Sequence, residues 1–335
     1  MKVAVLAPVA WRTPPRHYGP WEQIASNIAE GIIKLGGEVT LFATGDSITA
    51  GTLDAICATG YEEDRTQDAK VLECLHISNL MEKAGEFDII HNNFDFLPLT
   101  YSGLIKTPVI TTIHGFSSPR IIPVYKKYNH LGHYVSISNA DRSTELYYLA
   151  TVYNGLDTRD FQFYAQPDDY LLYFGRIHPD KGTAEAISIA KKSKRKLLIA
   201  GIVQDANYFK EKVEPLLGDG VEYIGHAGPD KRRELLGKAY ALLHPISFNE
   251  PFGLSVAEAM LCGTPVIAFN RGSMPELIKD AQTGFLVDTV DEAVDAVGWL
   301  DQISREDCFD WANSQFSSEK MVNDYWELYK RILNK

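Results

Sequence analysis

The stretch YALLHPISFNEPFGLSVAEAMLCGTPVIAF, residues 240–269, contains the pattern that decides the fold. An apolar, strand-like run (YALLHP) precedes the turn-forming letters NEP, a helix-like run that begins near Gly253, and a second apolar run, TPVIAF. A strand, a helix and another strand in this order form a βαβ unit, whose strands are parallel. The stretch therefore predicts an open parallel sheet covered by helices.

The same alternation runs along the whole chain in two cycles. Short apolar runs predict strands at residues 2–8, 38–44, 88–93, 108–114 and 134–138, and again at 170–177, 196–202, 221–225, 240–245, 264–269 and 284–288. Amphipathic stretches lie between them, such as residues 21–36, where Ile24, Ile28 and Ile32 share one helix face. The predicted fold class is α/β, with two Rossmann-like domains that face each other across a cleft.

The length of 335 residues also favours two domains, because single hydrophobic cores stop growing at roughly 250–300 residues. We expect an N-terminal domain at residues 1–153, a linker at 154–169, and a C-terminal domain at 170–312. The last segment, 313–335, predicts an amphipathic helix that packs back on the N-terminal domain. Its apolar stripe consists of Met321, Tyr325, Leu328 and Ile332.

Composition narrows the classes of partner. A net charge of −11 argues against general nucleic-acid binding, which selects basic surfaces. The four cysteines form no metal-binding or disulfide pattern, and the apolar N-terminus is too short to span a bilayer, so we expect a cytoplasmic protein. No membrane association is expected. The stretch between Asp95 and Asp141 has no acidic residue, however, so binding of an anionic acceptor or of a membrane surface is kept as an alternative. The oligomeric state is not predicted.

Ligands of open parallel sheets bind outside the carboxyl ends of the strands, so the residues after each strand are the candidates for a site. In FGRIHPDKG, Arg176 and Lys181 follow a strand and bracket a loop that enters a helix. Two cations beside a helix N-terminus suit a diphosphate. Taken singly, either residue is more often a solvated surface cation.

The second candidate group follows the strand at residues 240–245. Gly253 stands near the start of a helix, where its missing Cβ lets backbone amides approach an anion. Glu250 and Glu258 flank it and would accept hydrogen bonds from sugar and ribose hydroxyls. The alternatives are a plain loop residue for Glu250 and an acid that stabilises its own helix for Glu258.

The segments FGRIHPDKG, NEPFGLSVAEAMLCGTPVIA and RGSMPELIKDAQTGFLV together resemble the retaining GT-B glycosyltransferases of family four, and the resemblance covers essentially the whole chain. YGPWEQIASNIAEGI and VTLFATGDS resemble small bacterial members, some described as UDP-glucose:tetrahydrobiopterin glucosyltransferases. The resemblance implies that Arg176 and Lys181 hold the donor diphosphate. It implies that Glu250 contacts the transferred sugar and that Glu258 binds the ribose.

The resemblance implies that residues 1–153 form the acceptor domain and residues 170–312 the nucleotide-sugar domain. It also implies further donor contacts in the C-terminal half. The backbone amides of Phe252, Gly253 and Leu254 correspond to those that face phosphate and sugar in the family. The loop around His226 and Ala227 is similar to the one that lines the nucleobase.

The N-terminal half has weaker counterparts. His114 resembles the family histidine near the sugar and the acceptor, although a lone histidine is usually structural. Gly19 lies in a loop similar to the family's glycine-rich loop, where Pro20 replaces a second glycine and removes one N–H that would contact phosphate. Ser273 stands at a place often filled by glycine, with little expected consequence.

Absent motifs complete the prediction. The sequence contains no P-loop, no G-x-G-x-x-G and no Asp-x-Asp, so neither an ATPase nor a dehydrogenase is supported, and no cofactor or metal is expected. The predicted function is metal-independent, retaining transfer of a hexose from a nucleotide-diphosphate sugar, taken as a UDP-sugar, to a hydroxyl acceptor. The alternatives are a non-catalytic nucleotide-sugar binding protein and a nucleotide-sugar epimerase of similar fold.

Overall fold

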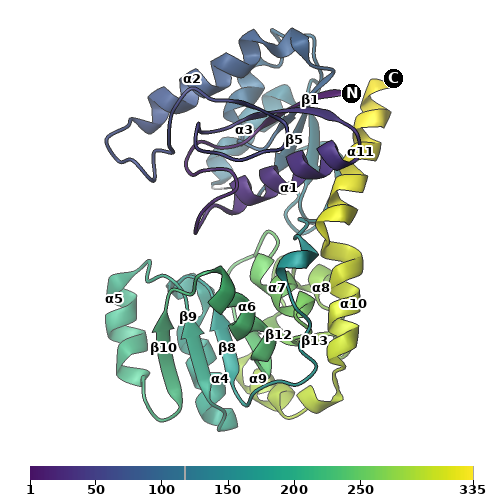
Figure 1. Cartoon of the computed structure of the whole chain (residues 1–335). Helices are drawn as coiled ribbons and strands as arrows, with labels where there is room; N and C mark the ends of the chain where they lie inside the picture. The colour runs from purple at the N-terminus through teal and green to yellow at the C-terminus, as the bar shows by residue number, and fades with distance from the viewer. Residues whose placement is uncertain (117, 335) are drawn as a thin grey trace. The chain divides into compact units, whose positions relative to one another are not determined.

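The computed structural model describes residues 1–116 and 118–334 (Figure 1). The chain divides into two compact units. Unit 1 consists of Met1–Leu156 and Ser318–Lys335, and unit 2 of Asp157–Ser317. Lys335, the last residue of the predicted terminal helix, lies outside the described residues. Within the residues described, no helix is both long enough and apolar enough to cross a membrane.

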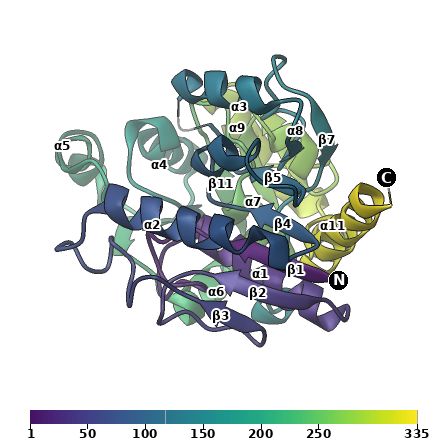
Figure 2. The same cartoon turned by 90° about the horizontal axis from the view of Figure 1, so that it is seen from above.

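Unit 1 is built on a parallel sheet whose strands run in the order β3-β2-β1-β4-β5-β6-β7, which Figure 2 shows from above. The strands are β1 (Lys2–Leu6), β2 (Glu38–Phe42), β3 (Thr52–Asp54), β4 (Ile89–Asn92), β5 (Val109–Ile113), β6 (His133–Ser136) and β7 (Tyr148–Thr151). Its helices are α1 (Pro20–Lys34), α2 (Ala69–Glu82), α3 (Ile122–Tyr128) and α11 (Ser318–Leu333).

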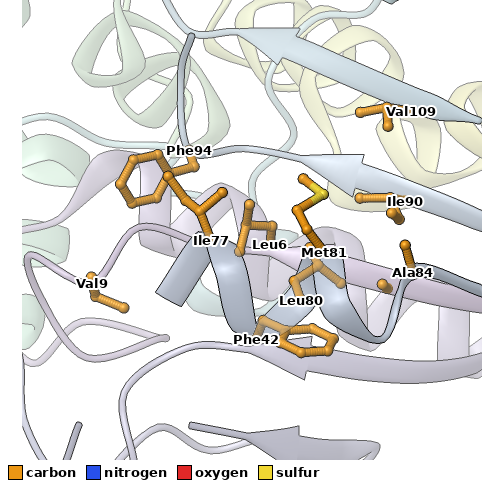
Figure 3. Close-up of a cluster of buried hydrophobic side chains, with 11 residues drawn as sticks. Leu6, Val9, Phe42, Ile77, Leu80, Met81, Ala84, Ile90, Phe94 and Val109 are labelled. Atoms are coloured by element: carbon orange, nitrogen blue, oxygen red, sulfur yellow. The ribbon is translucent and has the colours of Figure 1, made fainter. Parts of the chain in front are cut away.

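Helix α2 covers one face of this sheet. Figure 3 shows its residues Ile77, Leu80 and Met81 over Leu6 of β1 and Ile90 of β4, in one buried cluster. Because strands of a parallel sheet are buried on both faces, they read as continuous apolar runs. This is why KVAVL, the sequence of β1, shows no polar alternation.

Helices α1 and α11 pack against each other within unit 1 (Figure 1). The predicted stripe of α1 is confirmed, since Ile24, Ile28 and Ile32 are buried. The stripe of α11 is confirmed as well, with these residues buried: Met321, Tyr325, Leu328 and Ile332.

Helix α11 is also joined to the sheet through a buried polar network. The hydroxyl of Tyr329 lies 2.5 Å from Nδ1 of His91, and the hydroxyl of Tyr325 lies 2.6 Å from Oγ1 of Thr112. His91 Nε2 completes the network, 2.7 Å from the same Thr112 oxygen. Such a network is costly to disturb, because a buried polar group left without its partner lowers the free energy of unfolding by about 1–3 kcal/mol.

Unit 2 repeats the architecture with the strand order β10-β9-β8-β11-β12-β13. The strands are β8 (Leu171–Phe174), β9 (Leu197–Ala200), β10 (Val221–Gly225), β11 (Ala241–His244), β12 (Val266–Phe269) and β13 (Gly284–Val287). The helices are α4 (Thr183–Ser193), α5 (Ala206–Tyr208), α6 (Pro229–Lys238), α7 (Leu254–Leu261), α8 (Met274–Leu277), α9 (Val290–Val297) and α10 (Arg305–Phe316).

Each strand predicted from the sequence is present, and two further strands, β3 and β7, were not predicted. Both are edge strands of unit 1, and their residues are partly exposed. An edge strand has one unpaired side and needs no continuous apolar run, so the sequence pattern that reveals central strands is absent there.

The segment 154–169, expected to be a linker, is divided in the structure. The units separate after Leu156, and residues 157–169 belong to unit 2. Aromatic side chains attach the segment: the ring of Phe163 lies 5.6 Å from that of Phe309, and Phe161 is buried. The second division falls after Ser317, so that α10 belongs to unit 2 and α11 to unit 1.

The contact of α1 with α11 generates a prediction. A Cβ built on Gly31 would lie 2.3 Å from Cγ2 of Val322, so Gly31→Ala should lower the free energy of unfolding by about 1–2 kcal/mol despite the higher helix propensity of alanine. In a Val322→Ala background the same change should become stabilising. Urea denaturation of the four proteins measures both values.

Gly85→Ala is the matched control, because a Cβ there meets nothing within 4 Å. A Gly31→Ala variant more stable than the wild type would contradict the close packing of the two helices.

Candidate functional site

The carboxyl ends of β8 and β11 meet at the centre of the sheet of unit 2. The chain passes from β8 outward to β9 and β10, and then returns to place β11 on the other side of β8. This reversal of strand order is a topological switch point, where open α/β sheets bind their ligands. The loops that contain Arg176, Lys181 and Glu250 follow these two strands.

Lys181 and Glu250 form an ion pair at this point, with Nζ 2.6 Å from Oε2. Each side chain is only 14% exposed. The ammonium group also lies 4.4 Å from the centre of the Phe248 ring, a cation–π contact. A second nitrogen, Nε2 of buried His244, lies 3.7 Å from the same carboxylate oxygen.

The charged form of Glu250 is favoured by these neighbours. Burial alone would raise the pKa of its carboxyl, but the ion pair with Lys181 and the nearby imidazole of His244 outweigh burial and lower the pKa to about 2. Glu250 is therefore an anion at neutral pH.

Two glycines let the backbone approach this closely. A Cβ on Gly182 would lie 1.9 Å from the carbonyl oxygen of Pro245, and one on Gly272 would lie 2.4 Å from the backbone of Glu250. Both residues have positive φ, 72° and 56°, which glycine adopts without strain. The loop after β8 and the turn before α8 therefore pack directly on the segment that holds Glu250.

Gly253 begins helix α7 with φ 93°, as its sequence position predicts. The side chain of Phe252 is 2% exposed and packs against Phe316, so it belongs to the core and only its backbone is available for the predicted contact. Leu254 is the first residue of the helix. Ser273 has a consequence that was not expected, since its hydroxyl donates to the Phe252 carbonyl at 2.6 Å and holds this turn.

Glu258 lies in the second turn of α7 and is buried. Its carboxylate is 3.4 Å from Nη1 of Arg232 on α6, a partner that the sequence did not reveal. Burial raises the pKa of the Glu258 carboxyl, and the positive charge of Arg232 opposes that shift. With Arg232 as its cation at 3.4 Å, the Glu258 carboxylate still has capacity to accept further hydrogen bonds.

Arg176 occupies a different environment from Lys181. Its guanidinium donates to the side-chain oxygen of Gln204, a neutral group. Among the residues described, no carboxylate forms an ion pair with it, so its positive charge is not neutralised. The sequence placed Arg176 and Lys181 together, and the structure keeps them on one loop with different partners.

The remaining predicted donor residues follow β10. Ala227 is buried and His226 is exposed, in the loop that connects β10 with α6. Because β10 runs parallel to β9 and β8, this loop lies at the same carboxyl end of the sheet as Lys181 and Glu250.

His114 and Gly19 belong to unit 1, whereas the other predicted site residues belong to unit 2. His114 follows β5 and stacks on Trp21, with ring centroids 5.5 Å apart. With the Asn93 amide in this orientation, Nε2 of His114 donates to Oδ1 of Asn93 at 3.1 Å, and Nδ1 is buried with no partner among the described residues. Burial lowers the pKa of the imidazole to about 3, so His114 is neutral at physiological pH.

Gly19 precedes helix α1 with φ 150°. A Cβ there would lie 2.9 Å from Oε2 of Glu22, so the first turn of α1 is occupied by a carboxyl group of the chain itself. Oε1 of Glu22 accepts a hydrogen bond from the Trp11 amide at 3.3 Å. Pro20 offers no N–H to a phosphate, and the carboxyl group of Glu22 also lies beside the loop. The sequence pattern gave no sign of this second feature.

Unit 2 is similar to a known protein family. Residues 157–308 match the family described as glycosyl transferases group 1. The chain is 22% identical to an uncharacterized glycosyltransferase of Methanocaldococcus jannaschii, over 98% of this chain and 94% of that protein. It is 31% identical to the D-inositol 3-phosphate glycosyltransferase of Mycolicibacterium smegmatis, over 51% of this chain but only 42% of that protein.

Among solved structures, the fold is similar to that of HepE from Anabaena in complex with UDP. The TM-score is 0.75 at 18% sequence identity, with 99% of this chain and all of that chain covered. The structural similarity confirms the predicted fold class of two parallel-sheet α/β domains. The family match and the relatives named glycosyltransferases confirm the predicted enzyme class. Assignment to family four and the likeness to tetrahydrobiopterin glucosyltransferases remain predictions.

The ion pair of unit 2 generates a prediction. Lys181→Met leaves Glu250 buried without its cation, so the free energy of unfolding at pH 7 should fall by about 3 kcal/mol. Because the lowered pKa of Glu250 stabilises the fold above pH 4.5 and this contribution is lost towards pH 2, the difference from wild type should shrink as the pH falls through that window. Urea denaturation at pH 7 and pH 3 measures it.

The double variant Lys181→Met, Glu250→Gln is the control and should recover most of the loss, because it removes both charges. A loss of equal size at both pH values would show that the lysine stabilises the fold by packing and not by its charge.

Proposed function

We propose that the chain transfers a hexose from a nucleotide-diphosphate sugar to a hydroxyl acceptor with retention of configuration, because residues 157–308 match the family described as glycosyl transferases group 1. Unit 2 binds the donor and unit 1 binds the acceptor. The reaction breaks the bond from C1 of the sugar to the diphosphate and forms a bond from C1 to the acceptor oxygen. The hydroxyl proton leaves with a diphosphate oxygen.

One observation carries the proposal: a cation and an ionised acid meet between the carboxyl ends of β8 and β11. A diphosphate there receives the charge of Lys181, and the neighbouring Arg176 is not committed to a carboxylate. Both cations stabilise the negative charge that develops on the leaving group, which is where catalysis gains most. The leaving group then needs no metal ion, and we propose a metal-independent reaction.

Glu250 is suited to the sugar side of the reaction. An anion at neutral pH, it accepts hydrogen bonds from sugar hydroxyls and favours the positive charge of an oxocarbenium-like transition state. Glu258, with Arg232 beside it, is proposed to accept the ribose hydroxyls. The amides of Phe252, Gly253 and Leu254 are proposed to face the phosphate and the sugar.

The nucleotide is proposed to be UDP, because the similar structure of HepE is a complex with UDP. His226 and Ala227 are proposed to line the base. On the acceptor side, neutral His114 has an unprotonated Nδ1 that can accept a hydrogen bond from the acceptor hydroxyl. Gly19 is proposed to lie near the donor but not against its phosphate, because the carboxyl group of Glu22 lies beside it. We also propose a reducing, cytoplasmic location, since the four cysteines are unpaired.

The first test separates transfer from binding. With a UDP-hexose and a panel of hydroxyl acceptors, Glu250→Gln should lose at least 100-fold in the rate of UDP release while its calorimetric affinity for UDP stays within about threefold of wild type. Transfer at the normal rate would contradict the role of Glu250. UDP binding without turnover in the wild type would identify a binding protein, and an isomerised sugar without an acceptor adduct would identify an epimerase.

The second test concerns the diphosphate. Arg176→Ala should weaken UDP binding by about 10- to 100-fold, because a charge-assisted hydrogen bond contributes about 1.5–3 kcal/mol. Lys192→Ala is the matched control, since Lys192 is an exposed cation at the opposite end of α4 that pairs with Asp291. Isothermal titration calorimetry with UDP and UMP measures the effect, which should be confined to UDP. Equal loss in both nucleotides would place Arg176 away from the β-phosphate.

A further inference from the structure

Unit 1 contains a cavity of about 460 Å³ at its own topological switch point. The cavity is lined by the loop after β1, including Pro8 and Ala10, and by residues 94–97 after β4. In the sheet order β3-β2-β1-β4-β5, β1 and β4 are neighbours, and the chain leaves β1 towards β2 before it returns to β4. The carboxyl ends of these two strands are therefore the place where an open parallel sheet binds a ligand.

The walls of the cavity are aromatic. The side chains of Trp11, Trp21 and Tyr18 come from the loop after β1 and the start of α1, and Phe94 and Phe96 come from the other side. Aromatic side chains that line a cavity favour a flat ring, because offset or edge-to-face contacts add about 0.5–1.5 kcal/mol per ring pair to the burial of apolar area.

Three carboxyl groups also line the cavity, from Glu22, Glu73 and Asp95. None of the described lining residues is Lys, Arg or His. The hydrogen bonds that the three acids accept come from neutral groups: the Trp11 amide to Glu22, the hydroxyl of Tyr61 to Glu73, and the hydroxyl of Tyr125 to Asp95. Within the part of the chain that the structure describes, no cation forms an ion pair with these acids.

The electrostatics of these acids agree with that description. Burial raises the pKa of Glu22 to about 7 and that of Asp95 to about 6, and it raises the pKa of Glu73 as well. The charged neighbours that act on Glu22 and Asp95 are Glu63 and Glu73, both negative. A ligand that brings N–H donors or positive charge lets these carboxyls ionise, whereas an anionic ligand is repelled.

From the cavity, its aromatic walls and its uncompensated acids, we propose that unit 1 binds the flat aromatic part of a molecule that presents an amino or amidine N–H edge. An amidine matches a carboxylate with two parallel hydrogen bonds. The same site rejects phosphorylated and carboxylated compounds. That the bound molecule is the sugar acceptor rests on the proposed function.

The cavity shares a wall with His114, which connects it to the proposed transfer. Trp21 lines the cavity with its indole and stacks on the imidazole of His114. A molecule seated in the cavity therefore contacts the indole that supports the imidazole of His114.

A matched series of probes tests the charge preference: 2-naphthamidine, 2-naphthamide and 2-naphthoate have nearly the same shape and differ in charge. Binding is followed at pH 7.5 by quenching of tryptophan fluorescence in the full chain without donor, because Trp11 and Trp21 line the cavity. We expect saturable quenching by naphthamidine with at least tenfold higher affinity than naphthoate, and an intermediate value for naphthamide. Trp11→Phe should reduce the amplitude.

Two variants assign the preference to the acids. Glu22→Gln and Asp95→Asn should each weaken naphthamidine binding at least tenfold and narrow the gap to naphthoate; asparagine tolerates the positive φ of residue 95. Glu86→Gln, an exposed acid of unit 1, is the control and should change nothing. Thermal unfolding verifies that each variant folds. If Glu22→Gln does not fold, the binding result for Asp95→Asn decides the test.

Naphthoate binding as tight as naphthamidine, or amidine binding unaffected in Asp95→Asn, would overturn the proposal. The outcome is independent of the proposed function, because no donor is present. Amidine binding in a chain that releases no UDP from any donor would refute transfer and leave the cavity's specificity intact. UDP release from the donor with anionic acceptors, together with no amidine binding, would support transfer and refute the proposed specificity of the cavity.

Discussion

The parallel pairing of the strands is the constraint on which the rest of the structure depends. In each sheet, parallel strands bring all their carboxyl ends to one edge, so the loops that follow them are gathered there whatever their distance along the chain. Lys181 and Glu250 are 69 positions apart and nevertheless form an ion pair. The reversal of strand order beside β8 and beside β1 leaves each unit with one position where a ligand can enter between diverging loops.

The two switch points differ in charge. In unit 2 the ion pair of Lys181 and Glu250, with Arg176 on the same loop, offers positive charge for a diphosphate and negative charge for hydroxyl groups. In unit 1 the corresponding place is lined by acids and aromatic rings. On the two proposals above, the site in unit 2 takes the diphosphate and the cavity in unit 1 excludes it. Similar backbone topology thus supports two different ligand chemistries, because the loops and not the sheet supply the side chains.

Close backbone approach is what converts a loop into a site in unit 2. Gly182 lies against the carbonyl of Pro245, and Gly272 lies against the backbone of Glu250. Both have positive φ, and a Cβ on either one would clash with these neighbours. Ser273 then ties the turn to Phe252 through its hydroxyl. These contacts hold Glu250 beside Lys181 and His244, and this arrangement keeps its carboxyl ionised despite burial. Position and charge state therefore have one common origin.

The sequence by itself determined the central strands, the stripes of α1 and α11, and the loops that carry Arg176, Lys181 and Glu250, because burial and strand order leave a periodic trace in local composition. The edge strands β3 and β7 left no such trace. Tertiary structure alone decided the partners: Arg232 for Glu258, Phe248 and His244 around the ion pair, and Glu22 beside Gly19. Arg232 lies in a charged run that reads as a solvated helix face, and Glu22 reads as an ordinary first-turn acid. Which charged side chains form pairs depends on how the loops fold at the carboxyl end of the sheet. The distance between two such side chains cannot be predicted from the local sequence around either one.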